Sequence, residues 1–256
     1  MMRLSACIEM LFVKEEPDVA SRMRLAAEAG FDRIEFWHWR NKDIEAIDRA
    51  RRELGLAITG LLAEPVADLT DPACHDEFLA GLELSIAVAR RLAAPVLIAQ
   101  AGNELPGQPR AEQHQAIIVA LGRAAGLLAG TGVVLALEPL NTRIDHPGYY
   151  LSSTEEGLDI VDAVGHPEIK LLYDIYHSMV MGEEPSHVLA GRIDRIAHLH
   201  IADHPGRHQP GTGGLALAEA LAWIEGQGYA GAAGLEFVPK GATLPAVAET
   251  RAHLAT

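Results

Sequence analysis

Short, continuously apolar runs recur along this chain at intervals of about one strand and one helix. The runs at 95–100 (PVLIAQ) and 133–138 (VVLALE) do not alternate between polar and apolar residues. That pattern is typical of parallel strands covered by helices on both faces. Candidate strands of this kind lie at 3–8, 33–36, 56–61, 95–100, 133–138, 169–174, 196–201 and 232–237.

Amphipathic segments lie between the candidate strands, and their ends carry helix signals. Asp18 and Ser153 are start signals, and Gly55 and Gly165 directly follow predicted helices. The clearest helical segments are 18–29, 43–54, 76–92, 112–129, 154–164 and 215–227. Strict alternation predicts an α/β fold, and eight strands predict a (β/α)8 TIM barrel, with a doubly wound sheet as the alternative.

Length and composition predict one domain over residues 1–256 and disfavour some classes of binding partner. A single barrel needs ~250 residues, and no linker rich in Pro, Gly or Ser divides the chain. The formal net charge of −14, without a dense basic cluster, disfavours nucleic acid and anionic membranes as partners. Cys7 and Cys74 form no CxxC motif, and no apolar run approaches a span of ~20 residues. We expect a soluble cytoplasmic protein.

Four candidate strands end on, or just inside, a residue that can bind a metal. Glu138, Asp174, His200 and Glu236 are separated by 36, 26 and 36 residues, which is the length of a strand and helix unit. In a barrel the carboxyl ends of the strands share one mouth, so these side chains can meet there. Three carboxylates and one imidazole suit Mg²⁺ or Mn²⁺, with Co²⁺ as a further candidate. The pattern therefore predicts a site for a divalent cation.

Glu138 and Glu236 lie on predicted strands that are three apart, so we expect two bases that face a substrate from opposite sides. A cation that holds a carbonyl and a neighbouring hydroxyl acidifies the carbon-bound proton, and one glutamate then removes it. Reprotonation of the enediolate at the adjacent carbon gives an isomerase. Reprotonation of the same carbon from the other face gives an epimerase.

Further polar and aromatic residues near the strand ends are candidates for substrate contact. Arg207, in the long segment 202–214, can bind a carboxylate in a two-point fork, or it is a solvated arginine. For His177, Glu64 and Trp37 the alternatives to substrate contact are a core histidine, a structural acid and a core aromatic. Sequence alone leaves open the roles of three more residues, Glu35, His198 and Trp39.

Four stretches resemble a known family: LALEPLNTRIDHPGYYL, KLLYDIYHSMVMGEE, IAHLHIADHPGRHQPGTG and GLEFVP. They are similar to the hydroxypyruvate isomerases of the xylose isomerase-like barrel superfamily, and similarity at 3–12 and 26–37 extends the resemblance to nearly the whole chain. The resemblance implies interconversion of hydroxypyruvate and tartronate semialdehyde. It also implies site roles: a divalent metal on Glu138, Asp174, residue 200 and Glu236, acid–base catalysis by Glu138 and Glu236, and substrate contacts from His177 and Arg207.

One departure from that family keeps a second activity open. Hydroxypyruvate isomerases carry Gln where this chain has His200, and His there is more typical of ketose 3-epimerases. We therefore expect a small 2-oxo acid or a sugar as substrate, and a homo-oligomer is left open. A DNA-repair endonuclease barrel is disfavoured by the net charge, and a non-catalytic sugar-binding barrel by the four intact ligand positions. The segment 211–216 (GTGGLA) follows a loop, so no dinucleotide cofactor is expected.

Overall fold

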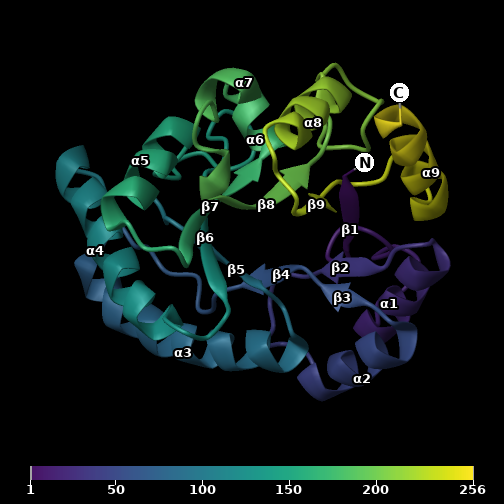
Figure 1. The fold of residues 1–256 in the computed structure, drawn as a ribbon, viewed down its shortest axis with the longest axis horizontal. Helices are drawn as coiled ribbons and strands as arrows, with labels where there is room; N and C mark the ends of the chain where they lie inside the picture. The colour runs from purple at the N-terminus through teal and green to yellow at the C-terminus, as the bar shows by residue number, and fades with distance from the viewer. Residues whose placement is uncertain (1, 256) are drawn as a thin grey trace.

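The computed structural model describes residues 2–255 and confirms the predicted TIM barrel (Figure 1). Across these residues, parallel strands form one sheet in the order β3-β2-β1-β9-β8-β7-β6-β5-β4. The helices lie outside the ring of strands. The strands are β1 Arg3–Cys7, β2 Arg33–Glu35, β3 Ala57–Ile58, β4 Gly60–Leu62, β5 Val96–Gln100, β6 Val134–Glu138, β7 Ile169–Asp174, β8 Ile196–Ile201 and β9 Ala232–Leu235.

The third predicted strand is split at Thr59 into β3 and β4, and this split joins the two ends of the sheet. β3 pairs with β2, whereas β4 pairs with β5. Thr59 N donates to Ile34 O at 2.9 Å, and Phe36 N donates to Gly60 O at 3.4 Å, so β2 contacts both pieces. The ring therefore closes, and the alternative of an open doubly wound sheet is wrong.

The predicted helices are present, and their ends follow the expected signals. The Asp18 carboxylate accepts a hydrogen bond from Ser21 N at 2.8 Å, and Gly55 ends its helix with φ of 68°. The sequence patterns missed α6, α7 and α9. The helices are α1 Val19–Glu28, α2 Ile44–Leu54, α3 His75–Leu92, α4 Arg110–Leu128, α5 Thr154–Val164, α6 Ile175–Val180, α7 Pro185–Val188, α8 Leu217–Gly226 and α9 Thr243–Leu254, with 3-10 turns at Pro72–Cys74 and Ile193–Arg195.

Alternate residues of the strands point into the barrel, as the pleat requires. A small apolar cluster of Val96, Ile98, Ala136 and Leu172, together with Leu62, fills part of the interior. The next inward position after Ala136 is Glu138, and the next after Leu172 is Asp174. Along β6 and β7, the inward-facing side chains therefore change from apolar to acidic at the carboxyl end of the strand. Within residues 2–255, the helices are all too short or too polar to cross a bilayer.

Candidate active site

Four side chains meet at the carboxyl ends of the strands, as the spacing predicts. Glu138, Asp174, His200 and Glu236 are buried, and each offers a ligand atom within 4.8 Å of the others. We call these four residues the ligand quartet. Its hard oxygen donors and single imidazole fit a divalent cation such as Mg²⁺, Mn²⁺ or Co²⁺.

A local irregularity in β8 determines the position of His200 along the barrel axis. Leu171 pairs with Ile196, but Leu172 pairs with His198, so Ala197 is an extra residue opposite β7. A bulge of this kind re-aims the side chains that follow it. Asp174 and His200 consequently pair directly and share one layer.

The members of the quartet are buried close together, and burial and neighbouring charges shift the pKa values of all four. His200 Nδ1 lies 3.2 Å from Glu138 Oε1 and 3.5 Å from Glu236 Oε2. Burial raises the pKa of Glu138, and it raises the pKa of Asp174 to about 6. Burial alone would also raise the pKa of Glu236, but the positive charges on His200 and Arg207 outweigh it and lower that pKa. The two glutamates therefore differ in their affinity for a proton.

The pKa of His200 is also raised, but by the neighbouring carboxylates and not by burial. Burial by itself would lower the pKa of this imidazole, but the carboxylates of Glu236 and Glu35 raise it well above the usual value. Without a cation, a protonated His200 partly compensates the buried carboxylates. A metal ion at the quartet has to displace that proton.

Arg207 reaches the quartet from the loop after β8, where its backbone adopts a φ of 53°. Its guanidinium donates to Glu236 Oε2, lies 3.8 Å from Asp174 Oδ2, and sits over the Tyr176 ring at 5.4 Å. The predicted substrate residue is thus in the site, but it pairs with a predicted catalytic glutamate. Its Nε has no hydrogen-bond partner among the described residues.

His177 lies in the short helix α6, which begins at Ile175, directly after Asp174. The Asp174 carboxylate caps this helix by accepting from His177 N at 3.1 Å. His177 Nδ1 accepts from Asn141 N at 3.2 Å, so the ring proton lies on Nε2, 3.5 Å from Asp174 Oδ2. Burial, followed by the positive charge of Arg207, lowers the pKa of His177 to about 3. His177 is therefore a neutral hydrogen-bond donor.

Of the remaining candidates for substrate contact, one lies in the site and one lies outside it. Trp37 lies in the site, where its indole Nε1 donates to Glu236 Oε1 at 2.8 Å. The Glu64 carboxylate instead accepts from Trp39 N and Arg40 N, at 2.6 and 2.9 Å, and lies outside the cavity lining. The Trp39 indole donates to Ser85 Oγ at 3.1 Å. Glu64 and Trp39 thus hold the β2–α2 loop together.

A cavity of about 350 Å³ opens above the quartet. The apolar side chains of Leu62, Val66, Ile98 and Leu140 line one part of it. Sequence reasoning missed three polar lining residues, namely Gln100, His38 and His146. The signal for Gln100 was present, because it ends the apolar run of β5 just as Glu138 ends β6. His146 lies in a loop whose shape no local pattern reveals.

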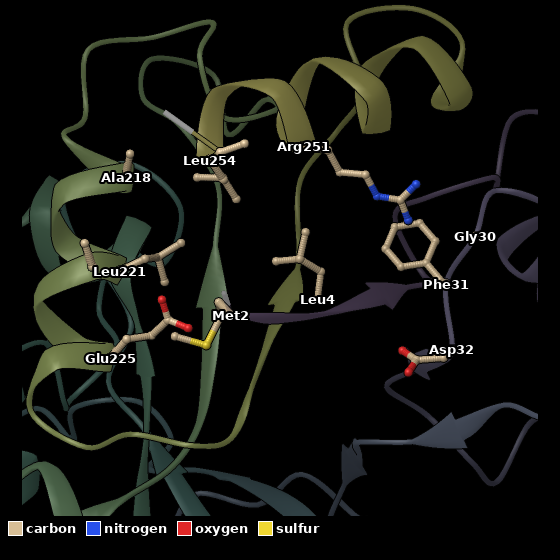
Figure 2. Close-up of a pocket in the computed structure, with 12 residues that line it drawn as sticks. Met2, Leu4, Gly30, Phe31, Asp32, Ala218, Leu221, Glu225, Arg251 and Leu254 are labelled. Atoms are coloured by element: carbon tan, nitrogen blue, oxygen red, sulfur yellow. The ribbon is translucent and has the colours of Figure 1, made fainter.

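A larger pocket, of about 480 Å³, lies at the opposite end of the barrel (Figure 2). It is formed by α8, α9 and the start of β1, and its charged lining residues are Asp32, Glu225 and Arg251. Active sites of TIM barrels lie at the carboxyl ends of the strands. The smaller cavity, which is lined by Glu138, His200 and Glu236 of the quartet, is therefore the candidate active site.

Comparison with known proteins agrees with this architecture. The family described as xylose isomerase-like TIM barrel matches residues 23–256. Hydroxypyruvate isomerase from Escherichia coli (strain K12) is 32% identical over 251 residues, covering 95% of this chain and 96% of the relative. A more distant relative, 2-oxo-tetronate isomerase from Pectobacterium atrosepticum, is 25% identical over 255 residues, with 95% and 94% covered.

Among solved structures, an AP endonuclease of family 2 from Brucella melitensis superposes with a TM-score of 0.92. The two chains are 28% identical, and 99% of each is covered. This chain belongs to the xylose isomerase-like TIM barrel family. Within that family, the resemblance to the hydroxypyruvate isomerases is confirmed by relatives that match almost from end to end.

Proposed function

We propose that this protein is a metal-dependent isomerase that interconverts hydroxypyruvate and tartronate semialdehyde, or a closely related pair of 2-oxo and aldehyde acids. One observation carries the proposal: Glu138 and Glu236 both contact His200 Nδ1 at the floor of a cavity. Full-length relatives named hydroxypyruvate isomerase and 2-oxo-tetronate isomerase support an isomerase of 2-oxo acids.

Glu138, Asp174, His200 and Glu236 would hold the cation. When bound, a divalent cation supplies a Lewis acid that polarises the substrate carbonyl and lowers the pKa of the neighbouring C–H group. Three of these side chains, Glu138, His200 and Glu236, line the cavity, so substrate oxygens in the cavity would lie next to the bound cation.

The two glutamates are suited to different halves of the proton transfer. Glu236 has the lowered pKa, so it is the carboxylate that removes the proton from C3 of hydroxypyruvate. The double bond then lies between C2 and C3, with charge on the oxygens. Glu138 has the raised pKa and delivers a proton to C2, which leaves an aldehyde at C3. The proton of the C3 hydroxyl passes to the oxygen on C2, so atoms and charge balance.

His177 and Arg207 would assist without exchanging protons themselves. The neutral His177 presents an Nε2–H group beside Asp174, where it can donate to a substrate oxygen. Arg207 holds Glu236 as a carboxylate and has an unpartnered buried Nε–H for a substrate carboxylate.

The Arg207→Ala variant tests the second of these roles. We expect KM to rise about 10-fold or more for acidic substrates, because a charge-assisted hydrogen bond is lost. KM for neutral ketoses would change little in the same variant. Equal effects on both substrate classes would contradict a carboxylate contact.

A ketose 3-epimerase is the second candidate, and the observation that favours it is His200. In that reaction the proton returns to the same carbon from the opposite face, so the same two glutamates would serve. The substrate would be a neutral sugar, for which the cavity of about 350 Å³ has room.

The deciding experiment is a substrate panel in D₂O with Mg²⁺ or Mn²⁺. Hydroxypyruvate, 2-oxo-tetronate and several free ketoses are incubated with the protein, and deuterium uptake at carbon is followed by NMR. Uptake into hydroxypyruvate with formation of tartronate semialdehyde is the expected result. Exchange only into a neutral ketose would replace the proposal with the epimerase.

The net charge of −14 argues against the DNA substrate of an endonuclease.

A further inference from the structure

We propose that Glu35 is a positioning residue, whose carboxylate holds the His200 imidazole so that Nδ1 faces the three carboxylates of the ligand quartet. This inference rests on the proposed metal site and gives a role to a residue beneath it. Glu35 Oε1 and His200 Nε2 face each other as an ion pair at 3.2 Å, and neither atom makes a hydrogen bond with any other described residue. His200 Nδ1 lies 3.2 Å from Glu138 Oε1. The ring therefore spans from Glu35 to the quartet.

The chemistry of the two ring nitrogens explains why the partner is a carboxylate. An ionised carboxylate only accepts hydrogen bonds, so the nitrogen that faces it carries the proton. With the proton on Nε2, the free lone pair of a neutral His200 is on Nδ1, directed at the quartet. A histidine ligand to a metal commonly donates its other N–H to a carboxylate in this way.

Glu35 is itself held in place inside the barrel. Its Oε2 accepts from His198 Nε2 at 2.8 Å and lies 3.0 Å from Thr59 Oγ1. Thr59 Oγ1 in turn lies 2.7 Å from Ser5 Oγ, and all these side chains are buried. The space for the carboxylate comes from Gly234, because a Cβ atom at that position would overlap it.

The same side chains also lie close enough together to hold an ion of their own. Glu35, His198 and His200 offer ligand atoms within 4.8 Å of one another. For His200 to bind one ion on each side, however, it would have to lose both ring protons. Glu35 Oε2 is already engaged with His198, and Glu35 Oε1 faces His200 Nε2 as an ion pair at 3.2 Å, so these contacts account for the lower layer without a second ion.

The first test compares Mn²⁺ affinity of the full-length protein by calorimetry at fixed pH. Glu35→Gln keeps the shape of the side chain but removes its charge. We expect its Kd for Mn²⁺ to rise about 10- to 100-fold, as for other carboxylates that support a histidine ligand. Asp48→Asn is the control, because it removes another buried carboxylate that pairs with Arg51 and Arg52 on α2. An unchanged Kd in Glu35→Gln overturns the inference.

A double-mutant cycle separates action through His200 from general damage. In a His200→Gln background, Glu35→Gln should cause no further loss of Mn²⁺ affinity. An equal loss in both backgrounds overturns the inference. So does a count of two Mn²⁺ ions per wild-type chain that falls to one in Glu35→Gln.

A third measurement does not need the Glu35→Gln variant, in case that variant does not fold. In Mg²⁺-loaded protein, ¹H–¹⁵N NMR of the imidazoles should find the His200 proton on Nε2, with the signal assigned by its loss in His200→Gln. A proton on Nδ1 overturns the inference. Wild-type protein that binds no Mn²⁺ overturns the proposed function as well, whereas tight binding unaffected by Glu35→Gln overturns this inference alone.

Discussion

The two halves of the barrel mouth contribute different chemistry. Strands β6 to β9 and the segments that follow them supply the whole ligand quartet, together with His177 and Arg207. The half from β2 to β5 supplies mainly apolar lining, including Leu62, Val66 and Ile98. In the proposed reaction the charged half moves the proton and binds the substrate carboxylate, whereas the apolar half limits the size of the substrate that the cavity admits. Substitutions in the two halves should therefore affect different kinetic parameters.

Removal of the metal should have the largest effect, because it affects the entire charged half. We expect EDTA to abolish isomerase activity and Mn²⁺ to restore it. Protons compete with the cation, since Asp174 has a pKa of about 6 and the pKa values of Glu138 and His200 are raised. Mn²⁺ affinity should accordingly weaken as the pH falls through about 6, with release of protons on binding above it. Full activity of metal-free protein would contradict the scheme.

The next largest effect is expected for the two glutamates. Glu138→Gln and Glu236→Gln should each lower kcat by ~10²-fold or more, because each removes a general acid or base. Circular dichroism and the melting temperature should stay near the wild-type values, since Gln fills the same space. Near-normal turnover in either variant would refute the two-base scheme.

The order and type of the strands were predictable because they follow from apolar runs and glycine stops. The split of the third strand at Thr59 was not, since it depends on which neighbour each half pairs with. The helix α6 was missed because it begins directly after a metal-ligand candidate, so Asp174 is at once strand end, helix cap and quartet member. Six residues are also too few for a helical period to be visible.

Within the site, the quartet was predictable from spacing, whereas its hydrogen-bond partners were not. Trp37 lies 199 residues from Glu236, and the Glu35–His198 pair is separated by 163 residues. No local pattern encodes such contacts, because they arise only when the barrel closes. Glu64 illustrates the opposite case: an acid near a strand end that binds backbone amides of the neighbouring loop.

Trp37 follows β2 and contacts Glu236, so it links the apolar half of the mouth to the charged half. Trp37→Phe keeps an aromatic wall but removes the N–H group that contacts Glu236 Oε1. We expect kcat to fall about 10-fold or more with little change in KM, because a hydrogen bond to a charged carboxylate is worth ~1.5–3 kcal/mol. Trp39→Phe, which loses only a bond to Ser85, is the matched control. A change confined to KM would make Trp37 part of the substrate wall.

Val66→Ala should have the smallest effect and should reveal the role of the apolar half. Val66 lines the cavity and is 45% exposed, so truncation widens the mouth without exposing the core. We expect the ratio of kcat/KM for 2-oxo-tetronate over hydroxypyruvate to rise about 3- to 10-fold, since small changes in apolar contact discriminate only weakly. Val13→Ala, at a similarly exposed position outside the cavity lining, should leave the ratio unchanged. If Val66→Ala lowers kcat equally for both substrates, the apolar half takes part in the chemistry and the division between the halves is wrong.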